Sequence, residues 1–129
     1  MNLLLDLHIF LWLASEPQRL PAAIVAAVTS PDNSCYLSIV SVWELQIKVG
    51  TGKLKLPIPI QQFVTINRAM NQIDSLSLTE SHIWTLGGLP SHHRDPFDRI
   101  LIAQAITEGW TVATVDRIFT RYPAKLLNQ

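Results

Sequence analysis

Charged residues are scarce in this chain of 129 residues. Only 16% of the residues are charged, and ten acidic residues balance ten lysines and arginines to a formal net charge of zero. A uniformly basic surface is therefore excluded, and any binding of nucleic acid has to come from local patches. Hydrophobic residues make up 48% of the chain, which indicates a globular protein with a large core rather than a disordered one.

Cysteine and long apolar runs are scarce as well. The single cysteine, Cys35, excludes an intramolecular disulfide and fits a reducing compartment, and its apolar neighbours favour a small buried side chain over a nucleophile. Residues 1–14 lack the basic start of a signal peptide and are interrupted by Asp6 and His8. No segment reaches the roughly 18 uninterrupted apolar residues of a membrane helix. We therefore expect a cytoplasmic protein without a membrane segment, folded as a single domain over residues 1–129.

The apolar pattern predicts strands that alternate with helices. Strands are expected at residues 2–5, 35–37, 74–78, 111–115 and 125–127, the third of them at a sheet edge because its polar and apolar residues alternate. Helices are expected at residues 8–14, 20–29, 60–71, 79–87 and 96–108, and another begins at Ser38 or Ser41 and ends near residue 49. This alternation predicts an α/β fold with a parallel sheet covered on both faces.

The stretch from residue 91 to 105 is the most concentrated in charge and turns directly into an apolar helix. Asp95 is a favourable N-cap, and Pro96 fits the first helical position. Asp98 then falls in the first turn, where the helix dipole favours a carboxylate. Gly109 fits the position that ends the helix. These features account for the stretch by helix formation alone, without a function.

Three further acids point to the same place as Asp98. Asp6 and Asp116 follow predicted strands, and Glu44 lies on the helix after the second strand. The helix that starts near Asp98 leads into the strand that ends near Asp116, so its N-terminus lies at the same edge of the sheet. Each acid also has a structural explanation. Asp6 can cap the helix that follows it, and Asp116 can start a turn. Glu44 can pair with Lys48, and Asp98 can interact favourably with the helix dipole. None of these explains why all four share one edge.

Four carboxylates in one pocket repel each other, by about 4 kcal/mol for each pair at 4 Å and an effective dielectric of 20. Such a cluster needs cations. Carboxylate oxygens without a cysteine or an HxxxH pair favour Mg²⁺ or Mn²⁺ over Zn²⁺. A hard cation that keeps some of its waters suits the hydrolysis of phosphate esters. The four acids therefore point to an enzyme of phosphoryl chemistry.

Basic residues near these acids are candidates for holding a phosphate backbone, although each is also explained as a solvated rim. The candidates are the arginines Arg94, Arg99, Arg117 and Arg121 and the lysines Lys48, Lys53 and Lys55. The adjacent histidines His92 and His93 point in different directions, so we expect a loop position near a nucleic acid, or simple solvent exposure, rather than metal ligands.

Four segments together resemble the PIN-domain family, and specifically its VapC-type toxin ribonucleases. They are LLLDLH at residues 3–8, LSIVSVWELQIK at 37–48, HRDPFDRILIAQA at 93–105 and VATVD at 112–116. The resemblance covers essentially the whole chain in order and spacing. It implies a three-layer α/β/α fold around a central, mainly parallel sheet of four to five strands. It also implies metal-dependent endonuclease cleavage of RNA, which leaves 5′-phosphate and 3′-hydroxyl ends.

The resemblance also assigns roles to particular residues. It makes Asp6, Glu44, Asp98 and Asp116 the catalytic residues and the ligands of Mg²⁺ (or Mn²⁺), with Asp95 as helix cap and support. It implies a small cognate antitoxin as the protein partner, RNA as the substrate, and a homodimer.

One position departs from the family pattern. Leu7 replaces the threonine that usually follows the first aspartate, which removes a hydroxyl that Ser38, Ser41 or Thr114 would have to supply. The alternative function is therefore a catalytically weak or degenerate PIN module that binds RNA or a protein without cutting. A haloacid-dehalogenase-like phosphatase also begins with a strand and an aspartate, but it needs a second acid two residues later, where this chain has His8.

Overall fold

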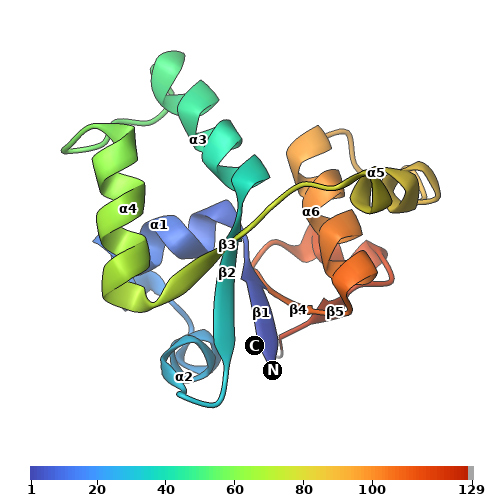
Figure 1. Ribbon diagram of the computed structural model, residues 1–129, viewed down its shortest axis with the longest axis horizontal. Helices are drawn as coiled ribbons and strands as arrows, with labels where there is room; N and C mark the ends of the chain where they lie inside the picture. The colour runs from blue at the N-terminus through green and yellow to red at the C-terminus, as the bar shows by residue number, and fades with distance from the viewer. Residues whose placement is uncertain (128–129) are drawn as a thin grey trace.

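A computed structural model describes residues 1–127 of the chain (Figure 1). Over these residues it contains five strands, six α-helices and two short 3₁₀ helices. In chain order they are β1 (Asn2–Leu5), α1 (Leu7–Ser15), η1 (Pro17–Arg19), α2 (Ala22–Thr29), β2 (Ser34–Ser38), α3 (Ile39–Gly50), α4 (Ile60–Asn71), β3 (Ile73–Leu76), α5 (Glu80–Gly87), α6 (Pro96–Glu108), β4 (Thr111–Ala113), η2 (Arg117–Arg121) and β5 (Lys125–Leu126). None of these helices combines the length and the apolar character that crossing a bilayer requires.

All five strands are parallel, in the order β3-β2-β1-β4-β5. The central strand β1 is fully buried over its three leucines, Leu3, Leu4 and Leu5, each 0% exposed. A continuous apolar run is what a parallel strand covered on both faces requires. The α/β fold with a parallel sheet is thereby confirmed, as is the expected place of the third strand at an edge.

Alternate side chains of β1 face two different cores. Leu3 and Leu5 pack in a cluster with residues of α1, α2, α3 and α4, whereas Leu4 packs with α6, β4 and η2. Figure 1 shows the corresponding layers, with α1, α2 and α4 on one side of the sheet and α5 and α6 on the other. The three-layer α/β/α arrangement follows from this period of two along a strand buried on both faces.

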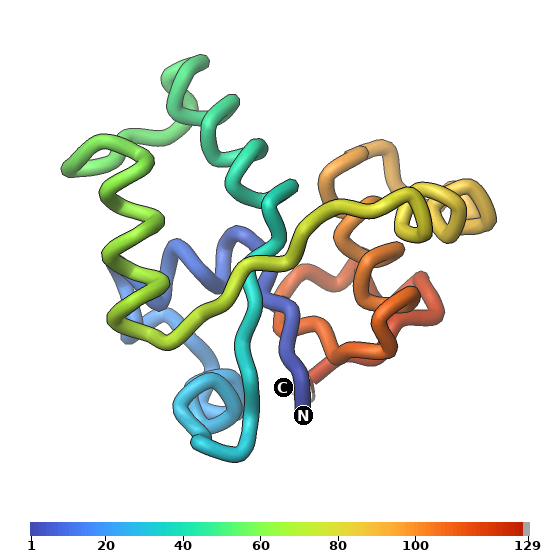
Figure 2. The backbone as a smooth tube through the Cα atoms, viewed as in Figure 1, coloured from blue at the N-terminus to red at the C-terminus, as the bar shows by residue number. Residues whose placement is uncertain are grey.

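The path of the chain creates a crevice at the carboxyl edge of the sheet. From β1 the chain adds β2 and then β3 on one side, and after β3 it passes to the opposite layer to form α5 and α6 (Figure 2). It then returns as β4 on the other side of β1. Strand order therefore reverses next to β1, and in parallel sheets such a point is where ligands bind.

The helix ends agree closely with the sequence signals. Asp95 caps α6, Pro96 is its first residue, and Gly109 ends it in the left-handed conformation with φ of 72°. Ser38, rather than Ser41, caps α3 by accepting a hydrogen bond from the backbone amide of Val40. These local rules operate within one turn of helix, which is why they can be read from neighbouring residues.

Several element boundaries differ from the sequence prediction by one to two residues, and three differences are of interest. Strand β4 ends at Ala113 instead of residue 115, and β3 covers Ile73–Leu76 instead of 74–78. The segment expected as a turn near residue 121 forms the 3₁₀ helix η2. The cause at β4 is side-chain capping, because the Thr114 hydroxyl accepts from the Asp116 amide at 3.0 Å and draws the backbone out of the strand.

Gln104 of α6 connects this helix to the end of β2 at the carboxyl edge of the sheet. It is 0% exposed, and its Oε1 accepts a hydrogen bond of 2.6 Å from the Ser38 hydroxyl. Its Nε2 donates to the Ser77 carbonyl at 3.4 Å. A buried amide with these partners fixes the end of β2 against α6, because leaving any of these groups unpaired is unfavourable.

We expect Gln104→Leu to lower the free energy of unfolding by about 1–3 kcal/mol, since the Ser38 hydroxyl, which is 0% exposed, loses its hydrogen-bond partner without access to water. Urea denaturation followed by circular dichroism measures the change. The control is Gln61→Leu, at an exposed position of α4, which should stay within about 0.5 kcal/mol of the unmodified protein. Equal stability of the two variants would contradict a structural role for the buried amide.

Candidate active site

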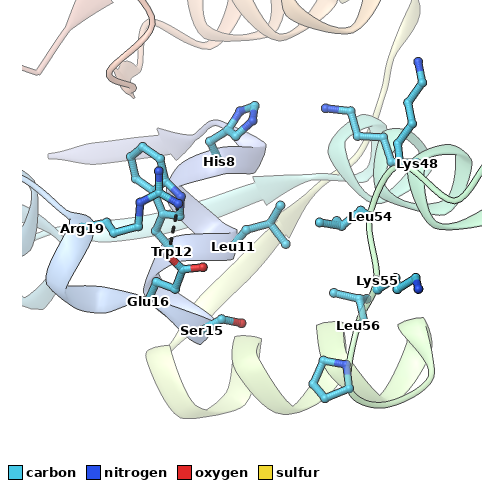
Figure 3. Close-up of a pocket in the computed structure, with 12 residues that line it drawn as sticks. His8, Leu11, Trp12, Ser15, Glu16, Arg19, Lys48, Leu54, Lys55 and Leu56 are labelled. Carbon is cyan, nitrogen blue, oxygen red and sulfur yellow. Dashed lines mark hydrogen bonds and ion pairs between the residues drawn. The ribbon is translucent and has the colours of Figure 1, made fainter.

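Two pockets lie next to each other at the carboxyl edge of the sheet. The smaller, of about 200 Å³, is lined by all four acids that the sequence singled out, Asp6, Glu44, Asp98 and Asp116. The larger, of about 470 Å³, lies between α1 and the segment after α3 (Figure 3). His8 and Lys48 line both. The four acids therefore come together from four separate parts of the chain, and we call their pocket the acidic pocket.

Asp6 is the most buried of the four acids, at 5% exposed. Its Oδ1 accepts a hydrogen bond of 2.8 Å from the amide of Ile9, which caps α1, and its Oδ2 accepts one from the Thr114 hydroxyl. Burial is the largest influence and raises the pKa of Asp6 above its usual value, although both hydrogen bonds oppose the rise. Asp6 is therefore both the cap that the sequence predicted and a wall of the pocket.

Glu44 enters the pocket from the second turn of α3. Its side chain is 12% exposed, and its Oε2 lies 3.1 Å from the Nζ of Lys48 one turn later. The i,i+4 pair that explained Glu44 structurally is thus present. It also keeps a positive charge at the rim of the acidic pocket, which both residues line.

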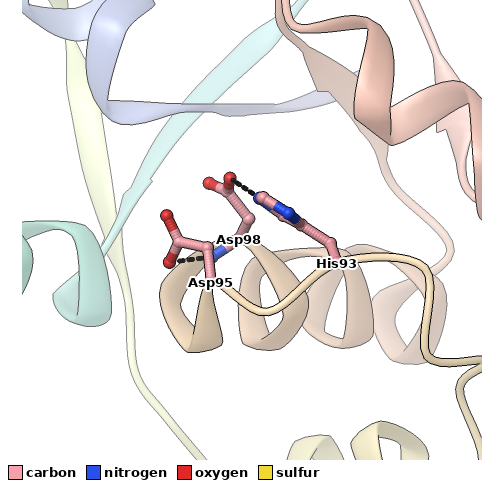
Figure 4. A group of neighbouring side chains, drawn as sticks. All are labelled: His93, Asp95 and Asp98. Carbon is pink, nitrogen blue, oxygen red and sulfur yellow. Dashed lines mark hydrogen bonds and ion pairs between the residues drawn. The ribbon is translucent and has the colours of Figure 1, made fainter.

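Asp98, Asp95 and His93 form a tight group at the start of α6 (Figure 4). His93 Nε2 donates to Asp98 Oδ2 at 2.9 Å, while Asp95 accepts from the amides of Phe97 and Asp98. One ligand atom of each of His93, Asp95 and Asp98 lies within 4.8 Å of those of the other two. These three side chains therefore offer a cation a compact set of donors.

The pKa of Asp98 is raised to about 6. Burial is the largest cause, and the neighbouring charges of Asp95 and Glu44 add to it, whereas the hydrogen bond from His93 opposes it. Near neutral pH the ionised carboxylate is thus poorly stabilised by the protein alone. A bound cation would relieve this electrostatic penalty.

Asp116 is the exposed member of the acidic pocket and caps η2 by accepting from the Ile118 amide at 3.0 Å. Thr114 lies between Asp116 and Asp6, because its hydroxyl contacts both the Asp116 amide and the Asp6 carboxylate. Leu7, which stands where the family has threonine, is 3% exposed and packs in the core. Thr114 is therefore the residue among the three candidates whose hydroxyl reaches Asp6.

The remaining candidates occupy different positions. Ser41 is buried and lines the acidic pocket, whereas the Ser38 hydroxyl is bonded to Gln104 and caps α3. The Arg99 guanidinium donates to the Leu89 carbonyl at 3.4 Å, so it supports the loop before α6 and is absent from the pocket wall. Two other basic candidates are exposed, at Arg94 and Arg117.

His93 lines the acidic pocket, a place that sequence reasoning missed. The adjacent pair with His92 suggested solvent exposure, but the N-cap at Asp95 folds the preceding residues back over the first turn of α6 and brings the His93 ring to Asp98. The spacing of two residues before an N-cap aspartate was the signal available. His92 is exposed and its ring packs against Tyr122 at 5.4 Å.

The donors in the acidic pocket fit Mg²⁺ or Mn²⁺. They are carboxylate oxygens with one imidazole nearby, and the described residues 1–127 contain one cysteine, Cys35, which is buried in the core away from them. Hard oxygen donors of this kind favour Mg²⁺ and Mn²⁺. Burial is the largest cause of the raised pKa values of Asp6 and Asp98, and neighbouring carboxylates add to it, so a bound cation would stabilise the ionised form of both.

Comparison with known proteins agrees with this geometry. The PIN-domain model matches residues 3–125. Ribonuclease VapC22 of Mycobacterium tuberculosis (strain ATCC 25618 / H37Rv) is 32% identical over 117 residues, which cover 90% of this chain and 88% of that protein. Among solved structures, VapBC2 from Rickettsia felis, bound to a DNA fragment from its promoter, has a TM-score of 0.75 at 19% identity and covers 98% of this chain and 97% of that one. VapBC-1 from nontypeable Haemophilus influenzae has a TM-score of 0.65 at 18% identity, covering 98% and 96%.

The pKa of Asp98 predicts how stability depends on pH in protein treated with a chelator. In the unfolded chain the carboxyl titrates near 4, and in the folded protein near 6. Its stabilising contribution is thus complete below about pH 4 and is lost as the pH rises through 6. We expect Asp98→Asn to be more stable than the unmodified protein at pH 7, by roughly 1–3 kcal/mol, and of similar stability near pH 4.

Urea denaturation in EDTA at pH 4.5, 5.5 and 7 measures this difference. The control is Asp32→Asn, which changes an exposed carboxyl outside the acidic pocket and should not alter the pH dependence. An Asp98→Asn variant that is less stable than the unmodified protein at pH 7 would show that the ionised carboxylate does not destabilise the folded protein.

Proposed function

The chain belongs to the PIN-domain family as a VapC-type ribonuclease toxin of a toxin–antitoxin pair, and we propose that it cleaves RNA in the cytoplasm with the help of Mg²⁺ or Mn²⁺. The observation that supports this proposal is the meeting of Asp6, Glu44, Asp98 and Asp116 in one pocket of about 200 Å³. Carboxylates gathered at the carboxyl edge of a parallel sheet are suited to hold a divalent cation.

In this proposal Asp6, Glu44 and Asp98 hold the principal cation, and Asp116 completes the site. When bound, such a cation activates water and stabilises the leaving oxygen of a phosphate ester. The overall reaction adds water across the P–O3′ bond. The water oxygen joins phosphorus, the 3′-oxygen leaves and gains a proton, and the products are a 5′-phosphate and a 3′-hydroxyl.

The surrounding residues keep the acids in position. Thr114 orients the Asp6 carboxylate, and Lys48 lies against Glu44. Asp95 fixes the first turn of α6 that carries Asp98, and His93 contacts the Asp98 oxygen. Ser41, which lines the acidic pocket, supports the acids. Arg94 and Arg117 are exposed and adjoin Asp95 and Asp116 in the sequence, so they are placed to contact the phosphate backbone.

The Leu7 position raised the possibility of a module that binds RNA without cutting it. The hydroxyl that Leu7 cannot supply comes instead from Thr114, which contacts Asp6 from the end of β4. All four acids line the pocket, and the residue after β4 supplies a hydroxyl to Asp6. We therefore favour a catalytic protein over a degenerate module that only binds RNA or a protein.

We expect Asp6→Asn, Glu44→Gln and Asp98→Asn each to lower RNA cleavage by roughly 100-fold or more, because each removes charge that the bound cation needs. EDTA should abolish cleavage, and Mn²⁺ or Mg²⁺ should restore it. Mn²⁺ should also raise the melting temperature of the unmodified protein but not of Asp98→Asn, since a ligand that binds only the folded state stabilises it.

Asp32→Asn serves as the matched control and should retain full activity. Sequencing and chemical analysis of the cleaved ends identifies the products. A 2′,3′-cyclic phosphate, or cleavage that persists in EDTA, would contradict this mechanism. Binding of RNA without cleavage in the presence of Mn²⁺ would support the degenerate module instead.

The proposed protein partner is a small antitoxin that covers the acidic pocket. A solved structure with this fold, VapBC-5 from Mycobacterium tuberculosis, is a member of the VapBC family of toxin–antitoxin systems. A basic antitoxin side chain among the four acids would relieve the same repulsion that a cation relieves.

The proposed homodimer has a candidate surface on α3. Ile39, Trp43 and Ile47 recur at i, i+4 and i+8 and are 46%, 60% and 40% exposed. Apolar side chains arranged in a stripe on a soluble protein indicate a contact surface.

We expect Ile47→Glu to convert the protein to a monomer, because a charge buried within an apolar interface is unfavourable. Size-exclusion chromatography with light scattering measures the mass. Gln18→Glu adds the same charge at an exposed site of η1 and should leave the dimer intact. A monomeric unmodified protein, or a dimeric Ile47→Glu variant, would exclude this surface.

A further inference from the structure

The larger pocket beside the acids has no role in the function proposed so far. With about 470 Å³ it has more than twice the volume of the acidic pocket. One wall comes from α1 and the other from the end of α3 and the segment that follows it (Figure 3). Because His8 and Lys48 line both pockets, a chain that leaves the acids past these two side chains enters this space directly.

The charge of this pocket is opposite to that of its neighbour. Its lining includes the basic residues Arg19, Lys48, Lys53 and Lys55, and Glu16 is the one acidic residue among those that line it. Glu16 is already paired with Arg19, at 3.1 Å. In a chain without net charge, this gathering of cations is a local patch of the kind that binding a polyanion requires.

The walls also carry flat and apolar surfaces. His8 and Trp12 lie one helical turn apart on α1 with ring centroids separated by 6.3 Å, and the Arg19 guanidinium lies over the Trp12 ring, 4.6 Å from its centroid. Leu11 of α1 and Leu54 of the opposite wall face each other across the pocket (Figure 3). Aromatic rings and guanidinium planes are the surfaces on which unpaired RNA bases stack.

We propose that this pocket binds a nucleotide of single-stranded RNA that flanks the scissile phosphate. The backbone phosphates contact Lys53 and Lys55 on one wall, and the base stacks on the Trp12–Arg19 pair on the other. The proposal rests on the function proposed above and adds where the substrate strand runs. RNA is favoured over a protein segment because the pocket combines a rim of cations with direct continuity to the acids, and both belong to a strand that passes through the site.

The lysines are tested by equilibrium binding of a 5′-fluorescein-labelled single-stranded RNA 12-mer, followed by anisotropy in EDTA. All variants are made in the Asp98→Asn protein, so that no cleavage occurs during the measurement. We expect Lys53→Gln/Lys55→Gln to raise Kd about tenfold and to flatten the slope of log K against log salt by roughly 0.7 for each lysine removed. The control for Lys55→Gln alone is Lys125→Gln, which removes the same charge from β5. Lys125 pairs with Thr111, the first residue of β4, and so lies toward the end of the sheet opposite the carboxyl edge.

The stacking surface is tested with the same RNA carrying one abasic residue, placed at each position in turn. In the Asp98→Asn protein one position should lose roughly tenfold in affinity, and in Asp98→Asn/Arg19→Ala that loss should disappear, because stacking on this surface is what the base supplied. Arg19 is exposed, so its truncation does not open the core.

Equal affinities and salt slopes for the Lys55→Gln and Lys125→Gln proteins, with no position sensitive to base removal, would overturn the proposal. Unchanged RNA binding together with lost antitoxin binding in the lysine variants would assign the pocket to the protein partner instead. Cleavage by the protein with Asp98 intact is measured separately, so a failure of the proposed nuclease activity is distinguished from a failure of this pocket.

Discussion

The pairing of β1 with β4 is the constraint on which the site depends. It places Leu5 opposite Ala113 and lets the Asp6 amide donate to the Ala113 carbonyl at 3.1 Å. The next residues, Asp6 and Thr114, are then brought together at the carboxyl edge, where the Thr114 hydroxyl meets the Asp6 carboxylate. Because β1 is buried on both faces, its register cannot slip without moving leucines out of the core. Core packing thus determines the place of an acid that the core itself disfavours.

The acids stabilise the local backbone and strain the pocket at the same time. Asp6, Asp95 and Asp116 each cap a helix, which satisfies amides that would otherwise lack partners. Capping directs each carboxylate to a helix N-terminus, and these N-termini meet at the same sheet edge. The caps therefore bring the acids together in one cluster, where burial above all, and repulsion between neighbouring carboxylates, raise the pKa of Asp6 and of Asp98. The structural explanation of each acid and its functional explanation are consequences of one geometry.

Much of this arrangement could be predicted from the sequence, for physical reasons that differ between its parts. The buried run Leu3–Leu5 and the caps at Asp95 and Gly109 follow from rules that act over a few residues, and the chain obeys them. The convergence of the acids followed from one longer-range rule, the common edge of parallel strands.

No such rule predicts contacts between side chains that are far apart in the sequence. The bond from Ser38 to Gln104 spans 66 residues and assigns Ser38 to the layer contact rather than to the acids. Arg99 is turned toward Leu89 by the loop before α6, and His93 is turned toward Asp98 by the cap at Asp95. Each depends on the direction of a side chain in the folded protein. That direction is fixed by neighbours that the sequence does not place next to it.

The zero net charge of the chain conceals a separation of charge that the fold produces. Helix α1 lies between the two pockets, since Asp6 caps it on the acidic side and His8, Trp12 and Glu16 line the larger pocket. Lys48 stands at the boundary, held by Glu44 at 3.1 Å and lining both spaces. A bare acidic pocket would repel a phosphate chain, whereas cations along the adjoining wall attract it and a bound metal ion offsets the acids. The two pockets are therefore complementary parts of one surface, in which the acids suit the cation and the neighbouring cations suit the polyanion that must approach it.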